Sequence, residues 1–270
     1  MYLVPSFNQN NFIMKRIFFF PLVLSLFACN SNTEKKVETT AKNTDLIGQN
    51  LKGKVQQIEE STVMIDSTGK NKPDSVIGVM MFDEKGYQTQ YYSKDSAGTH
   101  VSEQVMSHNA DGTFAELIVK KNGKQVSKLV TEVKDGKYTG GKNYDSTGKQ
   151  DGYYTDLKTN EYGQVYSGKQ HTMDGKIKST FDMKYDGANF IGGTSTDSTG
   201  KTTYTGVVTL NDKGDASEET TTTLEKDISK TEKFTYKYVL DDKGNWTERT
   251  AYNNNGKPTK ITKRMITYYK

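Results

Sequence analysis

Apolar and polar side chains alternate one by one along most of the chain after residue 50. Residues 177–185 are typical: one register holds Ile177, Phe181, Met183 and Tyr185, and the other holds Lys178, Thr180, Asp182 and Lys184. A period of two places successive side chains on opposite faces of a strand. The pattern therefore predicts strands with one apolar and one polar face, and beyond the N-terminal segment no window has the spacing of an amphipathic helix.

Clusters that end in glycine interrupt this alternation about every 13 residues. Pairs such as Asn122-Gly123 and Asp135-Gly136 suit two-residue hairpin turns, which need positive φ. Longer clusters, such as residues 66–69 and 145–148, begin with a turn-forming aspartate and end in glycine. One degenerate turn is expected at Lys226-Asp227. The spacing predicts about 16 antiparallel strands of about 8 to 9 residues in up-and-down order.

Open, twisted sheets rarely exceed about ten strands without curling, splitting or flattening. We therefore expect an all-β fold, a long antiparallel β-meander of hairpin repeats that forms an extended or partly rolled sheet. A closed β-barrel is the alternative. A transmembrane barrel would need an outward apolar band in nearly every strand, and the runs Glu218-Glu219 and Thr220-Thr221-Thr222-Thr223 do not supply one.

The N-terminal residues carry a different pattern. Lys15 and Arg16 precede an apolar run over residues 17–27, which is long enough for a secretion signal but short for a membrane span. The preceding residues do not fit a signal peptide, so Met14 is the expected start of translation. We expect a signal peptide within residues 1–28 and one β-hairpin repeat domain over residues 49–270.

The end of this run, Leu26-Phe27-Ala28-Cys29, resembles the lipobox of bacterial lipoproteins. The resemblance implies cleavage between Ala28 and Cys29 and a diacylglyceryl group on the Cys29 thiol; Phe27 departs from the usual small or aliphatic residue. Several acyl chains anchor a protein firmly in a membrane. Residues 29–48 are polar without periodicity and are expected to form a flexible tether. Because Asn30 is not the aspartate that retains lipoproteins at the inner membrane, the outer membrane is the expected location.

One turn carries a second resemblance. The stretch from Tyr236 through Asp241 and Gly244-Asn245-Trp246 to Arg249 is similar to the YD (RHS-type) repeats of bacterial envelope proteins. Residues 82–86, 144–148 and 185–187 are weaker copies. A looser similarity is to MORN and antitoxin-like hairpin repeats. These resemblances imply an extended hairpin-repeat protein and leave an immunity role open.

Composition limits the partners. Only 33% of the residues are hydrophobic, so a thick globular core is not expected. The net charge is +4 with alternating signs, and without a basic stripe no nucleic-acid partner is expected. Cys29 is the single cysteine, so the exported domain folds without an intramolecular disulfide.

No catalytic residue, metal site or cofactor is expected, because turn formation accounts for the aspartates and the three histidines are dispersed. Tyrosine and tryptophan suit contacts with sugars and proteins, and the candidates are Tyr91, Tyr153 and Trp246. Serines in Asp-Ser turns resemble the acceptors of an envelope O-glycosylation system, although Asp-Ser is also ordinary turn chemistry. These serines are Ser67, Ser75, Ser96, Ser146 and Ser198.

The expected function is that of a lipid-anchored, non-enzymatic binding or scaffold module of the cell envelope, with a protein or polysaccharide partner. The alternative is an immunity or inhibitor protein that acts against a toxin or an envelope enzyme. The sequence leaves open whether the anchored domain faces the periplasm or the cell surface.

Overall fold

The computed structural model describes residues 44–74, 76–225 and 227–270, which form one antiparallel sheet and one helical turn. In chain order the elements are α2 (Asp45–Gly48), β1 (Val55–Ile65), β2 (Asn71–Pro73), β3 (Val76–Phe82), β4 (Gln88–Asp95), β5 (His100–His108), β6 (Phe114–Lys121), β7 (Lys124–Lys134), β8 (Lys137–Tyr144), β9 (Gln150–Thr159), β10 (Val165–Thr172), β11 (Ile177–Asp186), β12 (Asn189–Asp197), β13 (Thr202–Leu210), β14 (Ala216–Glu225), β15 (Ile228–Leu240), β16 (Trp246–Tyr252) and β17 (Pro258–Tyr268). Within these ranges no helix has the length and apolar character of a membrane span.

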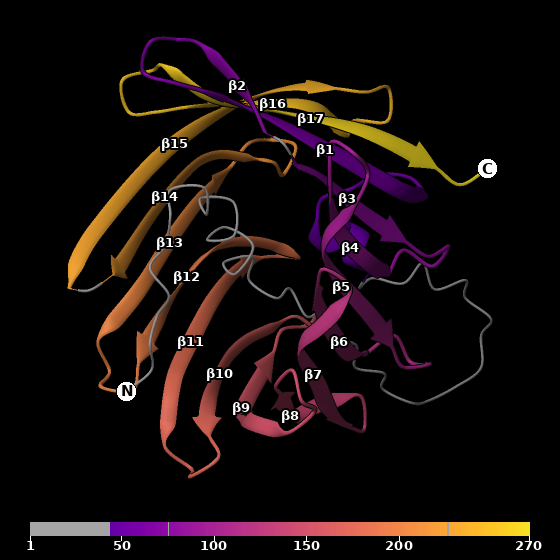
Figure 1. Ribbon diagram of the computed structural model, residues 1–270, viewed down its shortest axis with the longest axis vertical. Coiled ribbons are helices and arrows are strands. Elements are labelled where there is room, and N and C mark those ends of the chain that lie inside the picture. Colours follow the sequence, from indigo (N-terminus) through magenta and orange to yellow (C-terminus); the bar gives the residue numbers. More distant parts are fainter. Residues whose placement is uncertain (1–43, 75, 226) are drawn as a thin grey trace.

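The sheet closes on itself. Each strand from β3 onward pairs with the next, and β17 returns to pair with β1 from Val55↔Tyr268 to Met64↔Lys260. β2 and β3 pair with the same edge of β1 and therefore share one position around the barrel. The 17 strands of the described residues thus form a closed barrel of 16 strand positions (Figure 1). The expected extended or partly rolled sheet is therefore wrong, and the alternative closed barrel is confirmed. Closure is favoured because an open meander would leave the backbone groups of β1 and β17 unpaired.

The predicted turn chemistry is confirmed. In residues 145–148, the side-chain oxygen Oδ1 of Asp145 accepts the backbone N–H of Thr147 at 2.8 Å and that of Lys149 at 3.1 Å. Gly148 closes the turn at φ +82°, a conformation that side chains with a Cβ rarely adopt. The degenerate turn also exists, with Asp227 at φ 65° between β14 and β15.

The two faces of the barrel wall differ in polarity. A single-layered barrel encloses one face, so the buried register of each strand is the inner one. In β15 the inner register holds Phe234, Tyr236 and Tyr238, while Lys233 and Lys237 are exposed on the outer register. Ion pairs lie on the outer face. Lys94–Glu59 spans β3, and the pairs between adjacent strands are Lys120–Glu103, Lys128–Glu116, Lys142–Glu132, Lys233–Glu218 and Lys263–Glu248. Along residues 233–238 of β15, the aromatic side chains thus lie inside and the lysines outside.

Candidate functional site

The two ends of the barrel differ in the residue that follows the turn glycine. At one end this residue is buried in most turns, as in Tyr87, Thr113, Gln164, Asp215 and Asn245, which are at most 8% exposed; Lys137 is an exposed exception. At the opposite end it is an exposed lysine in most turns, namely Lys70, Lys124, Lys149, Lys176, Lys201 and Lys257. We call the first the strapped end, because a segment of chain crosses it. We call the second the open end, because no segment of the described residues crosses it.

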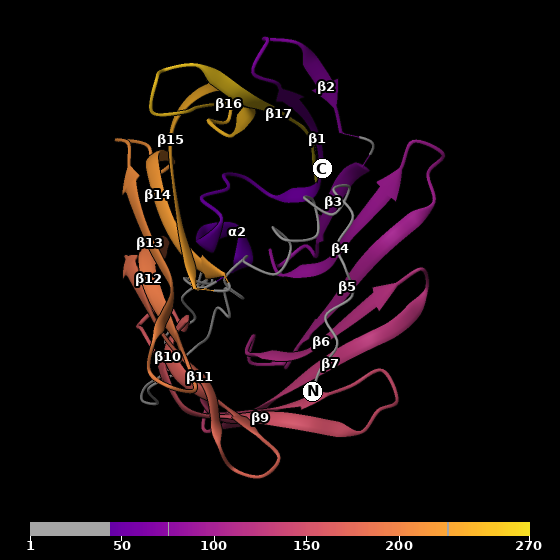
Figure 2. The same cartoon turned by 60° about the vertical axis from the view of Figure 1, so that its left-hand side comes forward.

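That segment is residues 44–54, which we call the strap. The backbone N–H of Leu46 donates to the carbonyl of Gly86, between β3 and β4. Nδ2 of Asn50 donates to Oδ1 of Asp215 at 2.8 Å, and the amide of Asn245 exchanges hydrogen bonds of 2.8 and 2.9 Å with the backbone of Lys52. The strap therefore crosses the ring of strands from β3–β4 to the turns before β14 and β16, and Figure 2 shows α2 inside that ring. Residues 44–48, which the sequence pattern assigns to the tether, belong to this packed segment.

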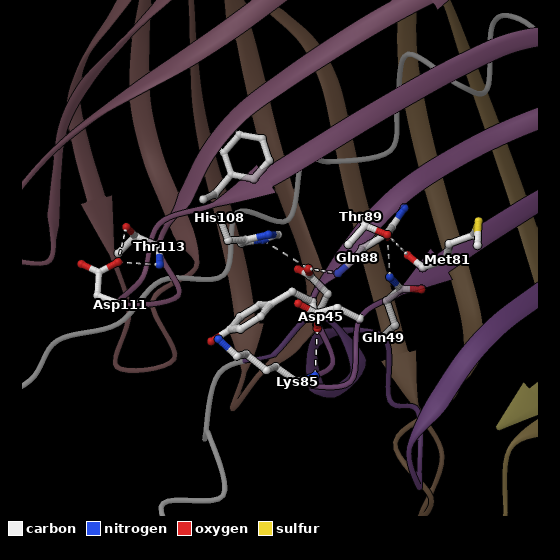
Figure 3. Close-up of polar contacts among 12 residues, drawn as sticks. Asp45, Gln49, Met81, Lys85, Gln88, Thr89, His108, Asp111 and Thr113 are labelled. Atoms are coloured by element: carbon white, nitrogen blue, oxygen red, sulfur yellow. Dashed lines mark hydrogen bonds and ion pairs between the residues drawn. The ribbon is translucent and has the colours of Figure 1, made fainter. Parts of the chain in front are cut away.

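A polar contact fixes the start of the strap against β4 and β5 (Figure 3). Oδ2 of Asp45 accepts the backbone N–H of Gln88 at 2.6 Å and lies 3.5 Å from Nε2 of His108. His108 packs between the rings of Tyr87 and Phe114, with its side chain 10% exposed. Burial lowers the pKa of His108 and outweighs the opposite influence of Asp83, so the imidazole is neutral at pH 7.

A charged network lies on the inner face where the barrel closes. Nε of Arg264 in β17 donates to Oε1 of Glu60 in β1 at 2.8 Å. The guanidinium of Arg264 lies 3.3 Å from the ring centroid of Trp246, and that of Arg249 lies 4.9 Å from the same centroid. Burial acts to raise the pKa of Glu60, but the adjacent Arg264 outweighs it and the pKa lies below its ordinary value. Glu60 is therefore a fixed anion at neutral pH and not a proton donor.

The same network extends to β14. The hydroxyl of Tyr236 donates to Oε2 of Glu219 at 2.5 Å, and burial followed by the charge of Glu219 raises the pKa of Tyr236. Buried polar atoms without a hydrogen-bond partner in the described part of the chain are Asp215 Oδ2, Arg249 Nε and Arg264 Nη1. These three atoms have almost no exposed surface.

An accessible cavity lies elsewhere on the strapped end. It has a volume of about 360 Å³ and is lined mainly by Asn160, Tyr162, Tyr166, Met183 and Tyr185. These residues come from the β9–β10 turn and the facing parts of β10 and β11. We call this cavity the tyrosine pocket. Burial raises the pKa of Tyr185 to about 12, so its hydroxyl stays protonated, and its ring packs edge-on against Phe190.

The side-chain amides of half-buried Asn160 and buried Gln164 hold the pocket in shape. Oδ1 of Asn160 accepts the backbone N–H groups of Tyr162 and Gln164, both at 3.0 Å. Gln164 is 1% exposed, and its Nε2 donates to the carbonyl of Ala188 at 2.7 Å. The β9–β10 turn is thereby tied to the β11–β12 turn. Tyr162 is fixed beside Gly187, where a Cβ would lie 3.6 Å from the Tyr162 hydroxyl.

The structure separates the aromatic residues singled out from the sequence. Trp246 is 7% exposed and lies in the charged network. Tyr91 faces inward, with its hydroxyl over Gly78, and burial raises its pKa to about 12. Tyr153 lies on the outer face, where its ring stacks on His171 with centroids 4.8 Å apart. None of the three lines the tyrosine pocket.

The turn serines share one location. Ser67, Ser96, Ser146 and Ser198 are exposed in turns of the open end. Ser75 lies outside the described residues, as do Ala28 and Cys29. Whether any of these residues is modified stays a prediction.

No protein-family model and no curated protein matches the chain. Among solved structures, a porin-like protein from Bacteroides uniformis aligns with 79% of this chain and 96% of its own, at 16% identity and a TM-score of 0.51. A porin-like protein from Bacteroides vulgatus covers 77% of this chain and 97% of its own, at 11% identity and a TM-score of 0.38. An exported protein with a YmcC-like fold from Bacteroides fragilis covers 90% of this chain and 99% of its own, at 11% identity and a TM-score of 0.28. The first alignment shows a shared barrel fold; the other two scores are too low to support an argument.

Proposed function

We propose that the chain is a non-enzymatic binding protein of the bacterial cell envelope, a water-surrounded barrel held at the outer membrane by a lipid on Cys29. The observation that carries this proposal is the polarity of the barrel wall. Ion pairs such as Lys233–Glu218 and Lys263–Glu248 cover the outer face, where a membrane barrel carries an apolar band. A barrel of this polarity needs a separate anchor to stay at a membrane, and the lipobox-like segment ending at Cys29 supplies one.

Binding is supported by the strapped end. The tyrosine pocket is a cavity with both aromatic rings and polar groups, and its turn is held by side-chain amides. Such preorganised, mixed surfaces favour ligand binding because little conformational freedom is lost on association. The charged network does not supply a proton donor, since Glu60 is held ionised by Arg264. A binding role without catalysis fits these features better than a hydrolytic one.

The test of the anchor uses the full-length chain with a C-terminal tag in a Gram-negative bacterium fed an alkynyl fatty acid. We expect the wild-type protein to carry the label and to sediment with the outer membrane. The Cys29→Ala variant should lose the label and appear in the soluble periplasmic fraction. Intact mass identifies any uncleaved signal peptide, and in that case a standard cleavable signal replaces residues 1–28.

A barrel that stays in the membrane fraction after loss of the lipid would overturn the proposal, because the wall itself would then be the anchor. The partner is sought by crosslinking in intact envelopes, followed by analysis of both polysaccharide and protein. Enrichment of polysaccharide supports the proposal. One protein at a one-to-one ratio would instead favour the immunity or inhibitor role.

A further inference from the structure

The tyrosine pocket carries an inference that rests on the proposed function and specifies its ligand: we propose that this pocket binds a sugar ring of a neutral glycan. The rings of Tyr162, Tyr166 and Tyr185 line one cavity of about 360 Å³. This volume lies near the lower end of the range for ligand pockets, roughly 300–1,000 Å³. It is large enough for a sugar unit and too small for a protein domain.

The chemistry of the lining matches a sugar. A sugar ring has an apolar C–H face and a rim of hydroxyl groups, so it needs a flat apolar surface beside hydrogen-bonding groups. Tyrosine offers both in one side chain. Asn160 adds one amide N–H, because its Oδ1 and its other N–H are hydrogen-bonded within the turn, and the exposed carboxylate of Glu161 adds acceptors. Because Glu161 would repel a second negative charge, a neutral sugar fits better than an acidic one.

The pocket is also formed before a ligand arrives. Gln164 links the β9–β10 turn to Ala188 through a buried hydrogen bond of 2.7 Å, and Asn160 fixes the backbone of Tyr162. The hydrogen bonds of the strap go to Gly86, Asp215 and Asn245, whereas the pocket opens beside the β9–β10 and β11–β12 turns. None of those strap hydrogen bonds involves a residue that lines the pocket.

The experiment measures binding of defined trisaccharides to the full-length acylated protein in detergent micelles, by saturation-transfer NMR and calorimetry. The probes are cellotriose, maltotriose, mannotriose and chitotriose, with trigalacturonic acid as the anionic comparison and a tyrosine-rich peptide as the protein mimic. We expect at least one neutral trisaccharide to bind and trigalacturonic acid to bind at least about tenfold more weakly.

Two variants test the location. Tyr162→Ala removes one wall of the pocket and should weaken binding at least about tenfold, as expected for an aromatic contact at the centre of a site. Gly187→Asn is compatible with the φ of +58° at this position and narrows the pocket beside Tyr162. Tyr153→Ala on the outer face is the matched control and should bind as the wild type does. Circular dichroism and the melting temperature report whether each variant is folded.

No binding of any neutral trisaccharide at 10 mM by folded wild-type protein would overturn the inference. The inference would also be overturned if folded Tyr162→Ala and Gly187→Asn bound the trisaccharide as tightly as the wild type does. It would likewise be overturned if the tyrosine-rich peptide bound and no trisaccharide did. These outcomes are separable from failure of the proposed function. If the Tyr162→Ala protein is still acylated and still enriches polysaccharide in envelopes, the binding protein stands and only this pocket is excluded.

Discussion

Glu60 and Arg264, 204 residues apart in the chain, face each other directly across the pairing of β1 with β17. Their hydrogen bond of 2.8 Å joins the first and last strands on the inner face of the barrel. Arg264 also stacks on Trp246 in β16, so the pair is supported from a third strand. The contact therefore lies where closure of the barrel depends on strands from opposite ends of the chain.

Replacing Arg264 by methionine should destabilise the barrel, because it leaves Glu60 on the inner face without its partner. Loss of one member of a buried ion pair typically costs about 3 to 5 kcal/mol. We expect a value near the lower limit, since the Glu60 side chain is 26% exposed. Urea unfolding of the purified protein measures the change. Lys263→Met, which removes the neighbouring outer-face pair with Glu248, should change the free energy of unfolding by less than about 1 kcal/mol. Equal effects of the two substitutions would contradict a special role for the inner pair.

Replacing Asn245 by alanine should release the strap. The Asn245 side chain accepts from the backbone N–H of Lys52 and donates to the Lys52 carbonyl and to the Tyr268 hydroxyl. Removing these contacts should cost about 1 to 3 kcal/mol and abolish slow hydrogen exchange at the Lys52 amide. Lys257→Ala is the matched control, because Lys257 holds the same place after its glycine at the open end. Unchanged exchange at Lys52 in Asn245→Ala would show that the strap is held by other contacts.

Acid should weaken the barrel through His108. Burial lowers its pKa in the folded state below the ordinary value of about 6.5, so the unfolded chain binds the proton more readily. The contribution of His108 to the free energy of unfolding is therefore fully present above about pH 6.5 and is lost as the pH falls below that value. Between pH 7 and pH 5.5 we expect the wild type to lose more stability than His108→Gln. NMR titration should place the midpoint of His108 below the ordinary value of about 6.5, and a midpoint above that value would contradict the burial argument.

Strand formation and turn positions could be predicted because both depend on neighbouring residues. Alternation in residues 177–185 and the Asp-to-Gly turns report local backbone preferences, and the structure has hairpins at these places. Closure could not be predicted in the same way. It depends on the register of β1 against β17, and the distance along the chain between Glu60 and Arg264 leaves no local signal.

The pocket was missed although a signal for it exists. The residue after the turn glycine is a lysine in most turns of one set and a residue such as Gln164 or Asn245 in most turns of the other, with Thr99 and Lys137 as exceptions. This alternation separates the two ends of the barrel and marks the end where side chains are buried. Trp246, a candidate contact residue from the sequence, comes directly after Asn245 and is turned inward against Arg264.

The pairing of β1 with β17 also decides when the molecule can be completed. On the proposed export route the N-terminal strands emerge first, and β1 has no partner on one side until residues 258–268 have emerged. Contacts between such distant segments form slowly. Between the emergence of β17 and closure, each chain carries two unpaired edges that match each other, so the β17 edge of one chain can pair with the β1 edge of another. Crowded secretion should therefore produce strand-exchanged dimers, and a chain that ends before β17 should associate instead of closing.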